Sequence, residues 1–346
     1  MTDTLTLRRP DDWHLHLRDG AVLARTVAHA ARQFGRAIVM PNLRPPVTTV
    51  AAAAAYRERI LRARPAGSTF EPLMTLYLTD NTSADEIAAA RASGFIHAVK
   101  YYPAGATTNS DSGVTGIERT WPALAAMERH RLPLLCHGEV TTPGVDLFDR
   151  ERVFVETVLP AIVERFPGLP VVLEHITTAE AAAFVAAAPP RVAANITAHH
   201  LLFNRNAIFE GGIRPHLYCL PVLKRERHRV ALVAAATGSS GRFFLGTDSA
   251  PHARENKECA CGHAGVYSAH AAIELYAQAF EAAGALDRLE AFASLDGPRF
   301  YRLEPNQERI VLRRESWTIP GAYDFGGSTL VPLGAGGQAA WTLAVR

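Results

Sequence analysis

The stretch Asp12-Trp13-His14-Leu15-His16-Leu17-Arg18-Asp19 begins a pattern that decides the fold. It is a strand-like run that ends in polar side chains, and a helix-like stretch follows it. The same order recurs along the chain. Strand-like runs lie at 12–18, 36–42, 71–79, 95–102, 132–138, 169–176, 191–198 and 242–248. Helix-like stretches lie at 20–34, 49–64, 83–93, 116–130, 149–166, 178–188, 224–237 and 267–284.

Eight strand–helix units predict an α/β protein with a parallel sheet that closes into a (β/α)8 TIM barrel. A doubly wound open sheet is the alternative, but it usually carries a glycine-rich phosphate turn after an early strand. No G-x-G-x-x-G occurs in this sequence. We expect residues 1–300 to form the barrel, with a further helix at 286–300. Residues 301–346 should form a short C-terminal tail packed on it, with no large β-sandwich domain.

The composition and net charge argue against several classes of function. The 346 residues carry 36 Lys+Arg and 34 Asp+Glu, a net charge of +2, which argues against a dedicated nucleic-acid binder. No tract suits a membrane span, no secretory signal is visible, and the four cysteines are few and unevenly spaced. These features predict a cytoplasmic protein. A chain of this length folds without a structural metal, so any metal present should serve chemistry.

The polar residues at strand ends are the candidate site, because parallel barrels bind ligands where strands end and loops begin. On the first strand, alternation places His14, His16 and Arg18 on one face, and Trp13, Leu15 and Leu17 on the other. Two imidazoles at this spacing can chelate one divalent ion. A pair of solvated or core histidines is the alternative interpretation.

Lys100 ends the fourth apolar strand, and it is one of only three lysines, with Lys224 and Lys257. A lysine buried there without a partner is costly, so we expect it to be neutralised, paired or modified, unless its stem carries the ammonium to the surface. His97, three residues earlier, should face the helix layer and serve packing.

Three more strands each end in a possible ligand, namely His137, His175 and Asp248. His252 follows shortly after Asp248 and is not counted among the ligands. With His14, His16 and Lys100, these three place six possible metal ligands at one end of the predicted barrel. Imidazole and carboxylate donors without cysteine favour zinc, or a similar divalent ion, at a catalytic site.

These motifs resemble the amidohydrolase superfamily and, within it, the short-chain dihydroorotase family. They are Asp12–Asp19, Met40-Pro-Asn-Leu43, Val99-Lys-Tyr-Tyr-Pro-Ala-Gly-Ala-Thr-Thr-Asn109, His137-Gly-Glu139, Glu174-His-Ile-Thr177, Cys219-Leu-Pro-Val-Leu-Lys224 and Gly246-Thr-Asp-Ser-Ala-Pro-His252. The resemblance extends from Asp11 to about Gly265, so only the tail lies outside it.

The resemblance implies two Zn²⁺ ions per subunit, bridged by a carboxylated lysine and a hydroxide. His14 and His16 would hold the more buried ion together with Asp248, and His137 and His175 would hold the second. Lys100 would be the N6-carboxylysine. Free lysine would repel two dications, whereas CO₂ addition makes it an anionic bridge.

The resemblance also implies the substrate and its contacts. The activity would be the reversible cyclisation of N-carbamoyl-L-aspartate to L-dihydroorotate with loss of water, the third step of pyrimidine synthesis, in a homodimer. Asp248 would be the catalytic base. The substrate-binding residues would be Arg18, Asn42 and His252 for the carboxylate, the backbone of Leu220 and Ala264 for the ring amides, and Thr107 and Thr108 on a closing loop.

Two other functions remain open: a hydantoinase or dihydropyrimidinase with the same metal ligands, or an inactive barrel that serves as a scaffold for a partner enzyme. Arg18 could instead form a surface ion pair with Asp19 or Asp12.

Some positions have no assigned role or depart from the family pattern. Asp111 adds a charge without an assigned partner, and His263 stands where the family more often has cysteine. His199 and His200 should pack around the site.

Overall fold

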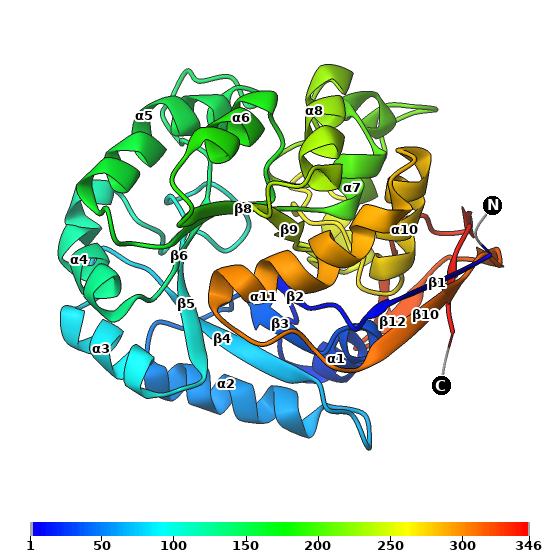
Figure 1. Cartoon of the computed structure of the whole chain (residues 1–346), viewed down its shortest axis with the longest axis horizontal. Coiled ribbons are helices and arrows are strands. Elements are labelled where there is room, and N and C mark those ends of the chain that lie inside the picture. Colours follow the sequence, from blue (N-terminus) through cyan, green and yellow to red (C-terminus); the bar gives the residue numbers. More distant parts are fainter. Residues whose placement is uncertain (1–2, 345–346) are drawn as a thin grey trace.

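Eight parallel strands form a barrel in the computed structural model, which describes residues 3–344 (Figure 1). The strands are β2 (Asp12–Leu15), β3 (Arg36–Val39), β4 (Glu71–Tyr77), β5 (Ile96–Tyr101), β6 (Leu134–His137), β7 (Val171–Glu174), β8 (Val192–Ile196) and β9 (Phe243–Leu245). They pair in chain order, and the last segment returns to the first. Asp248 N donates to His14 O (2.9 Å), and His16 N donates to Ser249 O (3.2 Å). The predicted barrel is confirmed, and the open sheet is excluded.

A helix follows each strand and covers the outside of the barrel. These helices are α1 (Leu23–Gln33), α2 (Val50–Arg62), α3 (Ala84–Ala92), α4 (Trp121–His130), α5 (Arg150–Arg165), α6 (Ala179–Ala187), α8 (Glu226–Thr237) and α10 (Ala272–Ala282). Hydroxyl caps begin several of them. Thr49 accepts from Ala52 N and Ser83 accepts from Glu86 N, which satisfies amides that a helix start leaves free. Two shorter helices, α7 (Ala198–Leu202) and α9 (Arg254–Lys257), lie in loops after the seventh and eighth barrel strands.

The barrel interior is filled by a cluster to which each strand contributes. It consists of Trp13, Ile38, Met40, Leu73, Ala98, Leu135, Val172, Ala193 and Phe244. Leu15 and Leu17 belong instead to the larger core that includes the helices. The prediction that Trp13 shares their face was therefore wrong. The β2–β3 register shifts between Asp12 and Leu15, and such an irregularity breaks the two-residue alternation.

One end of the barrel is closed by α11 (Asp296–Tyr301), which lies across it (Figure 1). Tyr301 stacks on Trp13 with ring centroids 4.3 Å apart. The helix predicted at 286–300 is only partly correct, because this segment is a 3₁₀ turn (Leu286–Arg288), a π-helical turn (Ala291–Leu295) and then α11. With this end sealed by side chains, the opposite end, where the strands finish, is left for the site.

Gly297 provides a test of this closure. A Cβ added there would lie 1.9 Å from Trp13 Nε1. Overpacking a filled core typically costs about 1–3 kcal/mol, so we expect Gly297→Ala to lower the free energy of unfolding by that amount in a urea titration. Gly321→Ala is the matched control, since no atom lies within 4 Å of its added Cβ. Equal stability of the two variants would contradict the packing described here.

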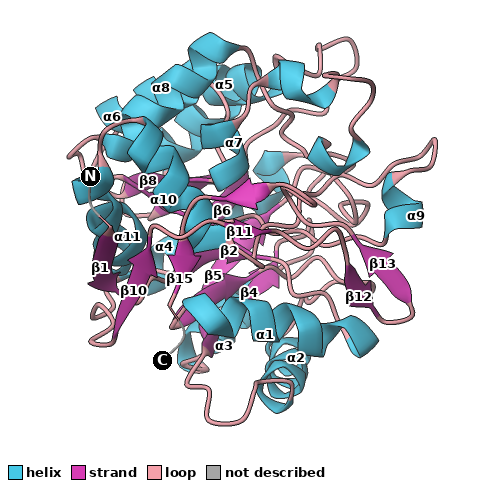
Figure 2. Cartoon of the chain, turned by 90° about the vertical axis from the view of Figure 1, so that its right-hand side faces the viewer, coloured by secondary structure: helices cyan, strands magenta, loops and turns pink. Residues whose placement is uncertain are grey.

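The C-terminal segment forms small antiparallel pairs beside the barrel (Figure 2). The N-terminal strand β1 (Thr4–Arg8), which the sequence analysis did not predict, pairs with β10 (Arg309–Arg313), and β10 pairs with β15 (Thr342–Leu343). β11 (Trp317–Thr318) pairs with β14 (Gln338–Ala339), and β12 (Tyr323–Phe325) pairs with β13 (Ser328–Leu330). Residues 1–2 of the predicted barrel segment and residues 345–346 of the predicted tail lie outside the described residues.

Within residues 3–344 there is no large β-sandwich domain. Among the helices of that same range, none combines the length and the apolar character that crossing a bilayer requires.

Candidate metal centre

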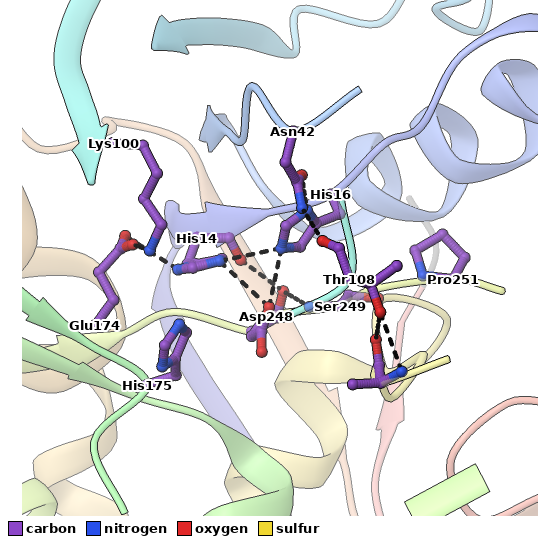
Figure 3. Close-up of polar contacts among 12 residues, drawn as sticks. His14, His16, Asn42, Lys100, Thr108, Glu174, His175, Asp248, Ser249 and Pro251 are labelled. Carbon is purple, nitrogen blue, oxygen red and sulfur yellow. Dashed lines mark hydrogen bonds and ion pairs between the residues drawn. The ribbon is translucent and has the colours of Figure 1, made fainter. Parts of the chain in front are cut away.

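Three predicted ligands meet at the ends of β2 and β9. Asp248 Oδ1 lies 3.2 Å from His14 Nε2 and 3.1 Å from His16 Nε2, and the two imidazole nitrogens are 3.2 Å apart (Figure 3). All three side chains are buried. Nitrogen and oxygen atoms this close, with no apolar atom between them, form a donor set that suits one divalent cation.

Two of the predicted ligands have an unusual backbone conformation. His175 and Asp248, just beyond β7 and β9, have φ values of +41° and +43°. Non-glycine residues rarely adopt this left-handed conformation, and it costs free energy unless the surroundings impose it. Here it turns each side chain away from the strand direction and toward the barrel mouth. A functional constraint on these positions explains why the strained conformation is retained.

Lys100 reaches the same space from β5. Its ammonium pairs with Glu174 Oε2 at the end of β7, and both side chains are fully buried. The other oxygen, Glu174 Oε1, lies 3.0 Å from His14 Nδ1, while Tyr102 places its ring 4.7 Å from Lys100 Nζ. Lys100 is therefore a buried, paired lysine, and the alternative of an ammonium carried to the surface is excluded.

His175 lies beside His14, and His137 lies beside His175. The His175 ring centroid is 4.9 Å from that of His14 and 4.9 Å from that of His137. His137 Nε2 donates a hydrogen bond to Glu139 Oε2 (2.8 Å). Its Nδ1 is therefore the ring nitrogen that could bind a metal. His175 Nδ1 is buried and has no hydrogen-bonding partner. The structure thus gathers all six predicted ligands in one buried cluster.

The charges of this cluster favour cations. Burial alone would lower the pKa of His14, but the Glu174 and Asp248 carboxylates raise it to about 9. Burial would likewise raise the pKa of Asp248, yet His14 and the other imidazoles hold it well below the usual range. Burial lowers the pKa of His16 to about 4, so that ring is neutral and its Nε2 can bind a metal. The buried Glu174 and Asp248 carboxylates, which favour a proton on His14, would equally favour a metal cation in its place.

Arg18 points into the pocket next to the metal ligands. Its Nε donates to Pro251 O (3.1 Å), and Nη2 lies 3.0 Å from His252 Nε2. The proposed surface ion pair is excluded, because Asp19 binds Arg59 (2.7 Å) and Asp12 accepts from Thr247. A planar guanidinium at a buried metal site suits a carboxylate, which it can bind with two parallel hydrogen bonds.

The loop after β5 closes over the pocket. Thr108 Oγ1 accepts from Ala264 N (3.2 Å), and Asn42 Nδ2 donates to Thr108 O (3.4 Å). Asn42 Oδ1 accepts from His16 Nδ1 (2.8 Å), which leaves His16 Nε2 for the metal. In this structure the loop therefore occupies the Ala264 amide.

The structure brings nearly all of the predicted residues to one pocket. Its lining includes His14, His16, Arg18, Asn42, Thr107, Thr108, His137, His175, Leu220, Asp248 and Ala264. Lys100 lies beneath it against Tyr102, and His252 borders it through Arg18 and Ala264 O (3.0 Å).

Other singled-out residues lie beside the pocket. His199 and His200 are buried in α7 near Cys219, and His200 bonds Thr197 and Pro221 O. The exposed Asp111 pairs with Arg44 at 3.3 Å. His263 packs edge-on against His252 with ring centroids 5.1 Å apart. None of these side chains supplies an atom to the six-ligand cluster.

The sequence analysis missed Glu174 and Glu139, although both lie in the motifs that it quoted. A buried carboxylate next to a ligating histidine fixes the ring and strengthens it as a ligand. Glu174 Oε1 lies 3.0 Å from His14 Nδ1, and Glu139 Oε2 lies 2.8 Å from His137 Nε2, so each acid is placed to hold the ring of a predicted ligand. The available signal was an acidic residue close to a strand-ending histidine. Glu174 lies directly before His175, and Glu139 lies two residues after His137.

We expect Glu174→Gln to weaken zinc binding about 10- to 100-fold, since the amide holds His14 less strongly than a carboxylate does. Zinc titration against a chromophoric chelator measures this change. Glu156→Gln, on the exposed face of α5, is the control and should bind zinc as the wild type does. An unchanged affinity in Glu174→Gln would remove Glu174 from this role.

Comparison with known proteins agrees with the site. Residues 12–310 match the amidohydrolase family. A dihydroorotase from Methylobacillus flagellatus is 67% identical over 343 residues, covering 99% of both chains. The structure of a Saccharomyces cerevisiae dihydroorotase in complex with 5-fluoroorotic acid has a TM-score of 0.91 at 31% identity, covering 99% of each chain. A Campylobacter jejuni dihydroorotase also has a TM-score of 0.91, at 33% identity, covering 100% of this chain and 98% of the other. The chain belongs to the amidohydrolase family and, within it, to the dihydroorotases.

Proposed function

We propose that the chain catalyses the reversible, zinc-dependent cyclisation of N-carbamoyl-L-aspartate to L-dihydroorotate, in pyrimidine biosynthesis. The observation that carries the proposal is the buried cluster of His14, His16, Lys100, His175 and Asp248 beside Arg18. The 67% identity to the Methylobacillus flagellatus dihydroorotase supports the same reaction, and the Saccharomyces cerevisiae dihydroorotase structure in complex with 5-fluoroorotic acid supports a ring of this class.

Two Zn²⁺ ions would be held by the six ligands. His14, His16 and Asp248 would bind the first ion, and His137 and His175 the second. Lys100, carboxylated on Nζ, would help to hold both ions, and Glu174 would hold the His14 ring. When bound, the pair supplies a nucleophilic water at neutral pH and polarises a carbonyl oxygen.

Substrate recognition would use the residues around the ligands. Arg18 binds the carboxylate of dihydroorotate through two N–H groups, and His252 and Asn42 complete that contact. Burial lowers the pKa of His252 far below its usual range, with Arg18 and Lys257 adding to the effect, so this imidazole stays neutral beside the guanidinium. The backbone of Leu220 and Ala264 faces the ring amide groups, and Thr107 and Thr108 close above.

Asp248 would carry the proton. In ring opening it accepts a proton from the attacking water and then donates it to the leaving ring nitrogen. In ring closure the same steps run backwards. A carboxylate suits this shuttle because it holds the proton only between two steps and returns to its anionic form after each turnover.

The decisive experiment is a spectrophotometric assay of dihydroorotate ring opening, with and without a chelator. We expect turnover that the chelator abolishes and zinc restores. Neutral hydantoins are the comparison substrates, and preference for them over carbamoyl aspartate would favour the hydantoinase alternative. A scaffold without activity would turn over neither class and would not need metal.

A homodimer in the cytoplasm remains part of the proposal, and it is supported by the family resemblance. Light scattering after size-exclusion chromatography would measure the mass in solution, and a monomer at micromolar concentration would contradict the dimer.

A further inference from the structure

Lys257 is a buried lysine that no step of the proposed reaction uses. It ends α9 in the loop after β9, and only 4% of its surface is exposed. Its ammonium donates three hydrogen bonds, to Tyr218 O (2.7 Å), His263 O (2.8 Å) and Gly265 O (2.8 Å). An ammonium has three N–H donors, so its capacity is filled by backbone carbonyls alone. Within the described residues, no carboxylate lies within ion-pair distance of it.

These three carbonyls flank the two backbone segments that border the pocket. His263 and Gly265 enclose Ala264, and Tyr218 lies two residues before Leu220. Both Ala264 and Leu220 line the pocket. Gly265 N also donates to Tyr218 O (2.9 Å), so the two segments are joined directly as well as through the ammonium.

The joined segments have little freedom to shift. A Cβ added to Gly265 would lie 2.6 Å from Ala250 O and 2.8 Å from the His252 ring. On the outer side, Ser328 Oγ of the β12–β13 hairpin donates to Glu255 of α9 (2.7 Å). If the ammonium were lost, His263 O and Gly265 O would lose this donor, and Tyr218 O would keep only Gly265 N, so the ammonium would no longer hold these peptides together.

The choice of lysine at this position fits the geometry. The chain has only three lysines among its 36 basic residues, and all three are buried. A compact ammonium can direct its three N–H donors to three carbonyls that surround it, as Lys257 does.

We infer that Lys257 is a positioning residue that sets the spacing of the Leu220 and Ala264 backbone, and with it the fit of the substrate's ring-amide edge and the docking of Thr108. The inference rests on the proposed function for its substrate. Lys257 touches neither substrate nor metal ligands, so its loss should weaken substrate binding far more than it slows the chemical step.

The test compares Lys257→Met with Lys224→Met. Lys224 is equally buried, at 4%, but donates only to Val222 O (3.0 Å). We expect Lys257→Met to raise KM for dihydroorotate on the order of tenfold or more, with kcat changed less than about threefold. Lys224→Met should keep KM near the wild-type value. An unchanged KM in Lys257→Met, or an equal rise in both variants, would overturn the inference.

Chemical rescue separates positioning from simple loss of packing. In Lys257→Ala, added n-propylammonium replaces the missing atoms and donors, whereas n-propanol replaces the size without the charge. We expect the amine, and not the alcohol, to lower KM again. Equal rescue by both compounds would contradict the role of the ammonium.

Hydrogen exchange gives a readout that does not need activity. Peptides covering 259–266 should exchange faster in Lys257→Met than in Lys224→Met, because the ammonium no longer holds Tyr218 O, the acceptor of Gly265 N, in place. Equal protection would also contradict the inference. A wild-type protein without ring-opening activity would refute the proposed function instead, and exchange would still report on the lysine.

Discussion

Lys100→Ala is expected to lose bound zinc and at least about 100-fold in turnover, the largest effect on metal content that any single substitution here should produce. Lys100 is fully buried at the centre of the cluster, where its ammonium pairs with Glu174. Carboxylation would turn this side chain from a cation into a bridging anion. Its removal would take away the ligand that the two ions are proposed to share, and it would leave Glu174 without its partner.

Short carboxylic acids provide the control for this prediction. Acetate or propionate can enter the space left by the lysine stem and supply two oxygens, so we expect partial recovery of both zinc content and turnover. Metal analysis by plasma mass spectrometry and the ring-opening assay measure the two outcomes. Lys224→Ala, which removes another buried lysine, should keep its zinc. A fully metallated and active Lys100→Ala protein would rule out the lysine bridge.

The barrel itself could be predicted because its signal is local. Each strand is a short apolar run, each is followed by a helix with its own cap, and eight such units leave few ways to fold. The ends of the strands then place the ligands, since all parallel strands finish on the same side. Six side chains from five strands could therefore be assigned to one site without any knowledge of their contacts.

What could not be predicted depends on irregular backbone and distant partners. The register shift in β2 separates Trp13 from Leu15, and no local pattern marks it. Glu174 contacts Lys100 across 74 positions of sequence, so its role becomes visible only in the folded chain. β1 is a five-residue strand whose partner β10 lies at the other end of the chain, and a short edge strand has too weak a pattern by itself.

Asp248→Asn is expected to reduce kcat by at least about 1,000-fold while zinc is largely retained. The amide keeps the size and one oxygen of the carboxylate, so it can remain beside His14 and His16. It cannot accept a proton from the attacking water, because its nitrogen is already a donor and its oxygen is far less basic. The five other predicted ligands would still hold the metal, which would separate loss of the proton shuttle from loss of the site.

The measurement that decides this case pairs kcat with metal content in the same sample. Asp12→Asn is a suitable comparison, since Asp12 is also buried but bonds Thr247 and the backbone amide of His14, and no side chain of the predicted ligands. We expect Asp12→Asn to lower the free energy of unfolding, with a smaller effect on kcat per folded molecule. If Asp248→Asn retained near-normal kcat with full zinc content, the proton would have to travel through another group, and the role of Asp248 would reduce to metal binding.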